Sequence, residues 1–224
     1  MTTLPRLFLL VFTLYFQAAC QVPPPVAPKP TAASAGPVGG GCDGCELMYV
    51  GMPDSISSVD TSSGFGGPGQ QLLIEGTVYL RDGKTPSPGV ILYYWQTDHT
   101  GLYSAKEGGD EGVRRHGDLR GWVKTGTNGS YAIYTVRPAP YPNTNNPAHV
   151  HISVKEPAIR NEYYIDDLLF ENDALVTQRL REGLEKRGGN GIVKVSGDQR
   201  LQMVKRNIVL GLNIPNYPQD YLNR

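Results

Sequence analysis

Residues 148–154, AHVHISV, alternate between apolar and polar side chains. A period of two is typical of a strand that packs one face on a core, so His149 and His151 share the opposite face. Between turns rich in Gly, Pro and Asn, apolar or alternating stretches predict further strands at 71–80 (QLLIEGTVYL), 89–95 (GVILYYW) and 130–136 (SYAIYTV). Residues 201–210 (LQMVKRNIVL) are a candidate closing strand.

These short strands predict an all-β fold, an antiparallel β-sandwich or a barrel, with long loops. Leucines spaced among charged residues over 173–187 predict one short helix. The 27 Gly and 18 Pro in 224 residues suit many turns better than long helices. The 21 Lys+Arg balance the 21 Asp+Glu, and a chain without net charge is a poor candidate for binding nucleic acid.

The first 19 residues predict an export signal, because Arg6 precedes a short apolar run that ends in small residues before Cys20. A Cys directly after Ala-Ala resembles the lipobox of bacterial lipoproteins, although Gln17 stands where that motif usually carries Leu. We therefore expect a lipid anchor at Cys20 as the only link to a membrane, with ordinary secretion as the alternative. Both predict an exported protein, located in the cell envelope, the periplasm or the medium.

Residues 20–41 are rich in Pro, Ala and Gly and predict a tether, since such a stretch buries too little apolar surface to fold. Residues 42–224 then form the folded domain. The domain opens on Cys42 and Cys45, a CxxC pair. With three Cys in the chain a four-Cys zinc site is excluded, and in an oxidising compartment a local disulfide is favoured over a redox dithiol.

The candidate chemistry lies in two His and two Tyr. His149 and His151 follow closely on Tyr141, which lies between prolines in RPAPYP, and Tyr103 ends the loop after the apolar strand 89–95. Imidazole together with hard phenolate oxygens suits iron better than the soft metals that thiolates select. Two phenolates offset part of the charge of a trivalent ion, so these four residues predict an Fe(III) site that would bind an aromatic diol.

The spacing of these motifs resembles the intradiol ring-cleavage dioxygenases, which include catechol 1,2- and protocatechuate 3,4-dioxygenases. The resemblance covers about residues 70–175 and is carried by Trp95-Gln96, Gly101-Leu102-Tyr103, Gly121–Thr125, Arg137–Pro142 and Pro147–His151. It implies a β-sandwich that binds Fe(III) through Tyr103, Tyr141, His149 and His151. The implied reaction cleaves a catechol between its two hydroxyl-bearing carbons with O2, giving a muconate-type product, and Tyr141 is the ligand that leaves when the substrate binds.

The chain departs from the family at Asn146, where family members commonly carry a substrate-steadying Arg. A neutral amide cannot replace a guanidinium. Either another cation enters the site, with Arg120, Arg114 or Arg115 as candidates, or the substrate needs none, or turnover is poor. Asn146, Arg120 and Trp95 are the predicted substrate contacts, and Trp95 is equally a candidate core aromatic.

Asp166 and Asp167 are candidates for the far wall of the pocket, or for capping and surface roles. Two other functions stay open at the level of sequence. One is an exported β-sandwich binding module that kept the scaffold and lost turnover, which Asn146 favours. The other is a storage or copper site built on the His-Val-His strand alone.

Overall fold

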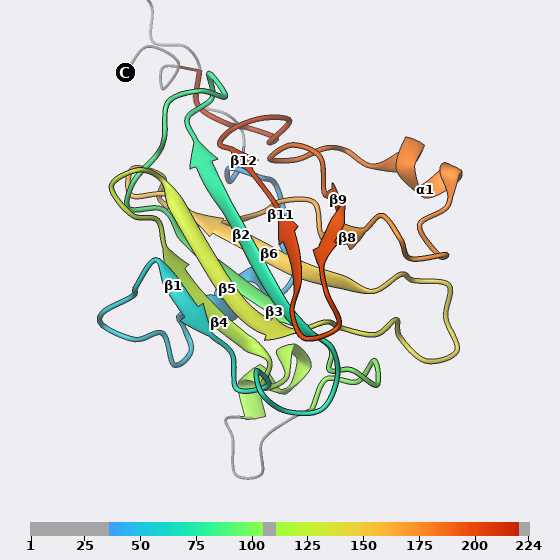
Figure 1. Cartoon of the computed structure of the whole chain (residues 1–224). Helices are drawn as coiled ribbons and strands as arrows, with labels where there is room; N and C mark the ends of the chain where they lie inside the picture. The colour runs from blue at the N-terminus through green and yellow to red at the C-terminus, as the bar shows by residue number, and fades with distance from the viewer. Residues whose placement is uncertain (1–35, 105–110, 220–224) are drawn as a thin grey trace, which may run out of the picture. The chain divides into compact units, whose positions relative to one another are not determined.

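The computed structural model of the protein describes residues 36–104 and 111–219, all within one compact unit that spans residues 34–224 (Figure 1). The predicted export signal, Cys20 and most of the predicted tether lie outside the described residues. Within the described part of the chain, no helix has the length and apolar character needed to cross a bilayer.

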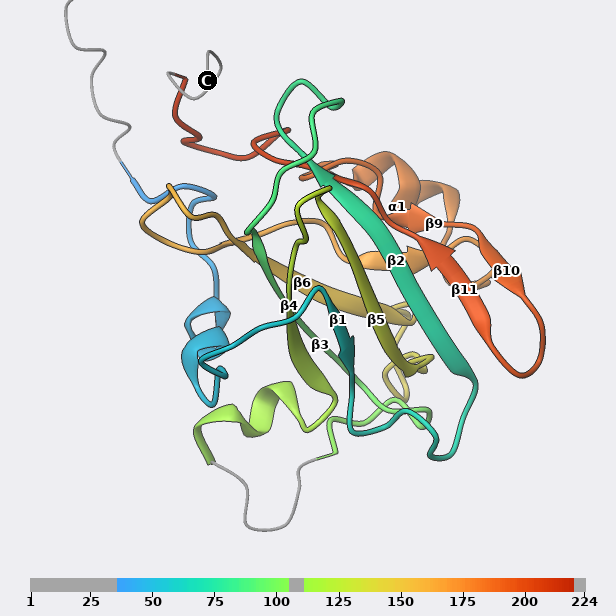
Figure 2. The same cartoon turned by 60° about the vertical axis from the view of Figure 1, so that its left-hand side comes forward.

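The described residues form two sheets, which lie as separate layers in Figure 2. The first sheet has the order β1-β5-β2-β11-β10, with β12 pairing with β2. Its strands are β1 (Val59–Thr61), β2 (Gln71–Tyr79), β5 (Ser130–Val136), β10 (Val195–Gly197), β11 (Gln202–Lys205) and β12 (Ile208–Val209). The central β2–β5 pair is antiparallel, whereas β1, β11 and β12 each pair with a parallel neighbour.

The second sheet has the order β4-β3-β6-β8-β9, with β7 pairing with β6. Its strands are β3 (Ile91–Gln96), β4 (Arg120–Lys124), β6 (His149–Lys155), β7 (Tyr163–Tyr164), β8 (Leu168–Phe170) and β9 (Ile192–Val193). The β3–β4 and β3–β6 pairs are antiparallel, and β8–β9 is parallel. The predicted β-sandwich is therefore confirmed, and its sheets are mixed because the short edge strands return after long connections.

The core lies between the sheets and takes one face of every long strand. On β6, Val150, Ile152 and Val154 are fully buried in this core, whereas His149 and His151 are half-buried on the opposite face. The alternation predicted for residues 148–154 is thus confirmed. It places the two imidazoles on the outer face of the second sheet.

A second apolar cluster covers part of this outer face. Tyr93 and Trp95 alternate outward from β3 and pack with Met48, which belongs to the 3-10 helix η1 (Cys45–Tyr49). The indole of Trp122 donates a hydrogen bond to the Met48 carbonyl (2.7 Å). The chain before β1 is thereby held against the sheet, so that it can form a wall beside the histidines.

A disulfide joins Cys42 to Cys45, with 5.6 Å between their Cα atoms. It closes the loop that leads into η1. The hydroxyl of Ser153, on the outer face of β6, donates to Cys45 Sγ (3.0 Å). The disulfide loop is therefore attached to the same strand that carries His149 and His151.

Two predicted elements are shorter in the structure. The closing strand over 201–210 is split into β11 and β12, because the chain turns its Arg206 side chain inward, where it is 1% exposed. The helix over 173–187 is reduced to α1 (Gln178–Gly183), which begins after the N-cap Thr177 and ends at the extended backbone of Leu184. The 3-10 helix η2 (Glu111–His116) and β4 were not predicted as elements.

Gly76 on β2 lies against the Arg206 carbonyl, and a Cβ at this position would lie 1.9 Å from that oxygen. The carbonyl cannot move freely, because it accepts a hydrogen bond from the Tyr131 hydroxyl (2.6 Å). We expect Gly76→Ala to destabilise the fold by about 1–3 kcal/mol, the usual cost of overpacking. In a domain of this size that lowers Tm by roughly 5 °C, measured by thermal unfolding.

Gly183→Ala is the matched control for that substitution. No atom lies within 4 Å of a Cβ built at Gly183, which is the last residue of α1. Its Tm should stay the same or rise slightly. An unchanged Tm in Gly76→Ala would contradict the close approach at β2.

Candidate active site

Four side-chain atoms form one continuous cluster on the outer face of the second sheet. The hydroxyl oxygens of Tyr103 and Tyr141 are 2.7 Å apart, and Tyr103 Oη lies 3.1 Å from His151 Nε2. His151 Nε2 in turn lies 3.1 Å from His149 Nε2. All four residues predicted as metal ligands therefore meet at one place, although they come from three segments of the chain.

The two tyrosines are carried by loops that are tied together. Tyr103 follows β3, and Tyr141 follows β5 of the other sheet. The Ala139 amide donates to the Asp98 carbonyl (3.0 Å). Gly101 adopts φ 85°, and a Cβ there would lie 2.1 Å from the Pro140 carbonyl oxygen. Since only glycine permits this contact, Gly101 sets how closely the two phenols approach.

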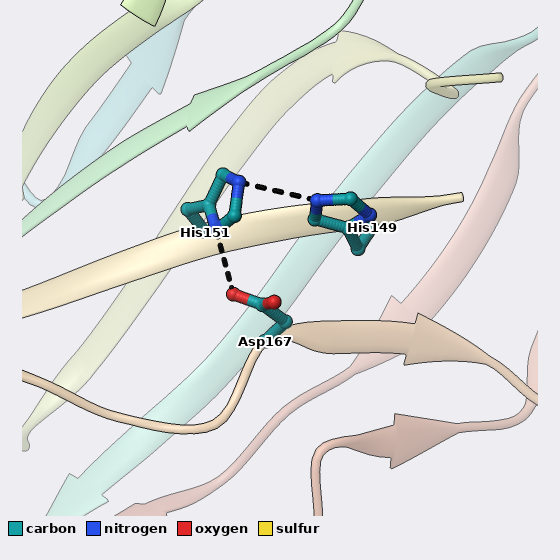
Figure 3. A group of neighbouring side chains, drawn as sticks. All are labelled: His149, His151 and Asp167. Carbon is teal, nitrogen blue, oxygen red and sulfur yellow. Dashed lines mark hydrogen bonds and ion pairs between the residues drawn. The ribbon is translucent and has the colours of Figure 1, made fainter. Parts of the chain in front are cut away.

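The hydrogen bonds of the histidines fix their tautomers. His149 Nδ1 is 2.7 Å from the Pro147 carbonyl oxygen, and His151 Nδ1 is 2.8 Å from the carboxylate of Asp167 (Figure 3). Both partners are acceptors, so each Nδ1 carries the proton and each Nε2 presents a lone pair. Two lone pairs 3.1 Å apart cannot hydrogen-bond to each other, and a shared cation satisfies both.

The donor set therefore fits a metal ion. Nitrogen and oxygen ligands of a metal such as zinc lie about 2.0–2.2 Å from it, so neighbouring donors around one ion are separated by about 3 Å, as these four atoms are. His149, His151 and Asp167 also form a group compatible with metal binding by distance. Asp167 already serves as the hydrogen-bond acceptor of His151 and is best described as the residue that orients it.

The phenols are held protonated when no cation is near. Burial raises the pKa of Tyr103, and its hydrogen bond to Tyr141 raises it further. Burial raises the pKa of Tyr141 as well. A bound cation lowers the pKa of both phenols because its charge dominates locally.

The two neighbouring aspartates have different roles. Burial alone would raise the pKa of Asp167, but the charge and hydrogen bond of His151 outweigh it and hold that pKa below its usual value. Asp166 instead accepts the backbone amides of Lys186 (2.8 Å) and Arg187 (3.2 Å). Asp167 therefore belongs to the site, whereas Asp166 fixes the chain that follows α1.

A cleft with two compartments surrounds the cluster. The larger compartment, about 600 Å³, contains Tyr141, His149 and Asp167 and reaches the residues around α1. The smaller, about 330 Å³, is lined by Gly41, Cys42, Asp43, Trp95, Arg115, His116, His151 and Tyr164. Gly41, His151 and Tyr164 line both, so the compartments meet beside the donor atoms.

Comparison with known proteins identifies the family of this chain. A family model described as Dioxygenase matches residues 53–187, more than half of the chain. This chain belongs to the intradiol ring-cleavage dioxygenase family. It is 30% identical over 163 residues to catechol 1,2-dioxygenase 1 of Acinetobacter lwoffii, covering 62% of this chain and 50% of that protein. Chlorocatechol 1,2-dioxygenase of Burkholderia cepacia is 29% identical over 139 residues, covering 51% and 49%.

Solved structures of the family share the fold. 3-Chlorocatechol 1,2-dioxygenase of Rhodococcus opacus 1CP superposes with a TM-score of 0.54 at 19% identity, covering 72% of this chain and 68% of that one. Hydroxyquinol 1,2-dioxygenase of Pseudomonas putida DLL-E4 superposes with a TM-score of 0.51 at 22% identity, covering 81% of this chain and 68% of that one. The chain spans about half the length of the curated relatives it matches.

The residues predicted to contact a substrate lie in three different places. Trp95 lines the smaller compartment, and its ring stacks on His151 with 4.8 Å between centroids. Asn146 lines the larger compartment from an exposed loop. Arg120 lies in neither, since its guanidinium donates to the Val50 carbonyl (3.0 Å) and lines a separate cavity. The prediction that Arg120 reaches the substrate is therefore corrected.

Two cations do line the cleft. Arg115 lies in the smaller compartment and pairs with Asp43 and Glu46 at 3.0 and 3.2 Å. Arg187 lies in the larger compartment, where it pairs with Glu185 at 2.5 Å. Both charges are locally compensated, so the described walls of the cleft carry no cation that is free of a carboxylate.

Sequence reasoning missed His116 and Tyr164. His116 is 4% exposed, and burial lowers its pKa to about 4. The chain contains four His in all, and that scarcity was the available signal. The position of His116 beside Trp95 depends on η2, which the sequence did not predict.

The orienting role of Asp167 can be tested by Asp167→Ala. Losing the acceptor of His151 Nδ1 should weaken retention of iron by about 10–100-fold, the usual effect of removing such a partner. Asp167→Asn keeps a carbonyl acceptor for His151 Nδ1, so its retention of the metal should fall less than that of Asp167→Ala. Competition with a chelator, followed by metal analysis, measures the difference.

Asp54→Ala removes an exposed carboxylate that lines neither compartment and is the control. Equal iron retention in Asp167→Ala and in this control would contradict the assignment.

Proposed function

We propose that this protein is an Fe(III)-dependent intradiol dioxygenase that cleaves a catechol-type ring between its two hydroxyl-bearing carbons, using O2 and giving a muconate-type product. The observation that carries the proposal is the pair of Nε2 lone pairs facing each other beside two phenol oxygens. Membership in the dioxygenase family supports the same reaction.

Tyr103, Tyr141, His149 and His151 would hold the iron. When bound, a ferric ion would supply a Lewis acid for a catechol's two oxygens and would make its ring reactive toward O2. The imidazoles enter as neutral ligands, because burial lowers the pKa of His149 and the proton of each ring is retained on Nδ1.

Tyr141 is the residue suited to take a proton from the substrate. It lies at the larger compartment, is half-buried, and its hydroxyl oxygen is 2.7 Å from that of Tyr103. Its loop is stiffened by prolines on both sides, so a Tyr141 phenolate formed beside a bound cation could take one hydroxyl proton from a catechol with little loss of entropy. Tyr103 is more deeply held between Tyr141 and His151 and is suited to stay in place.

The cleft walls orient the diol and restrict water. Trp95 and Tyr164 line the cleft together with His151 and contribute apolar wall beside the donor atoms. Asn146 at the rim supplies an amide and no charge. A neutral rim suits a catechol whose negative charge is carried by its own two oxygens.

Oxygen uptake on a panel of catechols, with identification of the products, tests the reaction. Cleavage between the hydroxyls is expected, together with a visible colour from ferric tyrosinate that shifts when a catechol is added. A colourless protein that takes up no iron when iron is supplied would contradict the proposal and favour a binding module. Zinc or copper in the metal analysis would favour a storage site.

Tyr103→Phe should bleach or shift the colour and reduce oxygen uptake by more than about 100-fold. Removing even a residue that only hydrogen-bonds a metal ligand usually lowers metal affinity or activity by about 10–100-fold. Tyr134→Phe is the control, because Tyr134 packs edge-on against Phe65, away from the cleft. Turnover by Tyr103→Phe at the control rate would remove Tyr103 from the ligand set.

We also propose that the protein is exported and that Cys20 carries the lipid anchor. The apolar run before Ala18, Ala19 and Cys20 supports this. An intact mass of membrane-fraction protein should include the lipid. An unmodified Cys20 would contradict the anchor and leave ordinary secretion.

A further inference from the structure

His116 has no part in holding the metal, yet it is built into the wall of the smaller compartment. Its ring stacks on Trp95 with 4.2 Å between centroids and 7° between planes. Trp95 stacks in turn on His151. His116 therefore lies two ring spacings from His151, and both residues line the smaller compartment.

The hydroxyl of Tyr93 fixes the tautomer of His116. Its Nδ1 is 2.9 Å from the Tyr93 hydroxyl, and the oxygen of that hydroxyl also accepts from Arg120 (3.4 Å). No other acceptor among the described residues is bonded to the Tyr93 hydroxyl, so its proton points at His116 Nδ1. The ring proton of His116 then sits on Nε2, because a neutral imidazole carries one N–H.

The Nε2 edge of His116 lies beside Gly44, whose φ is 85°, and a Cβ there would come within 2.8 Å of Nε2. No hydrogen bond joins Nε2 to an acceptor among the described residues, and it is not one of the fully buried unpartnered atoms. Because His116 lines the smaller compartment, its Nε2–H is a donor there without an internal acceptor.

Resting on the proposed function, we propose that His116 Nε2–H is a substrate-contacting donor that selects catechols bearing a hydrogen-bond acceptor on the ring. Tyr93 is its positioning residue. The acceptor is a neutral group such as a ketone rather than a carboxylate, because Asp43 lines the same compartment and Arg115 is already paired with it. An apolar substituent would leave the donor buried and unsatisfied, which costs affinity.

The test compares two substrates of the same shape, 3,4-dihydroxyacetophenone and 4-isopropylcatechol, with the iron-loaded full chain. His116→Phe keeps the stack on Trp95 and removes the donor. The ratio of kcat/KM for the ketone to that for the hydrocarbon should fall about tenfold relative to wild type, mainly through KM. Comparing ratios cancels the electronic effect of the ketone on the chemical step.

His116→Gln restores a side-chain N–H and should recover most of the ratio. The double variant Tyr93→Phe, His116→Phe removes both buried polar partners, so it keeps the test available if the single variant unfolds, and it should give the same low ratio. An unchanged ratio in either Phe variant, or an equal loss for both substrates, would overturn the role of His116.

Dissociation constants from anaerobic titration separate this inference from the proposed function. In wild type they should favour the ketone, and in the Phe variants the preference should be lost. Absence of ring cleavage with every catechol would defeat the proposed function, whereas binding without the ketone preference would defeat only the role of His116.

Discussion

The site depends on one constraint, which is that two imidazoles on the same face of β6 present lone pairs to each other. The Pro147 carbonyl and the Asp167 carboxylate accept the hydrogen bonds of the two Nδ1–H groups. Neither His149 nor His151 therefore carries a proton at Nε2. Such a pair costs free energy unless a cation or a proton donor lies between the two nitrogens. The phenols of Tyr103 and Tyr141 complete a donor set with room for an ion.

The site lies on the outside of the sandwich, and this explains the cleft. The inward face of β6 is used by the core, so the outward face needs a separate cover. Residues 41–49, with their disulfide and η1, supply one wall of the cleft. Met48 and Cys45 attach this segment to the sheet. A site between the sheets would have no space, because interiors are close-packed.

This covering segment lies before the region shared with the family. The family match begins at residue 53, whereas Gly41, Cys42 and Asp43 line the smaller compartment. The four donor residues thus lie on the shared β-sandwich, and part of the cleft wall is contributed by sequence outside it.

The sequence by itself determined the long strands β2, β3, β5 and β6 and the buried face of β6, and it singled out the four side chains that the structure brings together. These follow from local alternation and from motif spacing, as in AHVHISV, where the period alone assigns Val150 to the core and His151 to the other face. Tertiary structure decided what depends on contacts distant in sequence. Arg120 is turned away toward Val50, Asp167 is bonded to His151, and His116 is brought beside Trp95. Loop and 3-10 backbone carry little periodic signal, so the side chains they place cannot be located from sequence pattern alone.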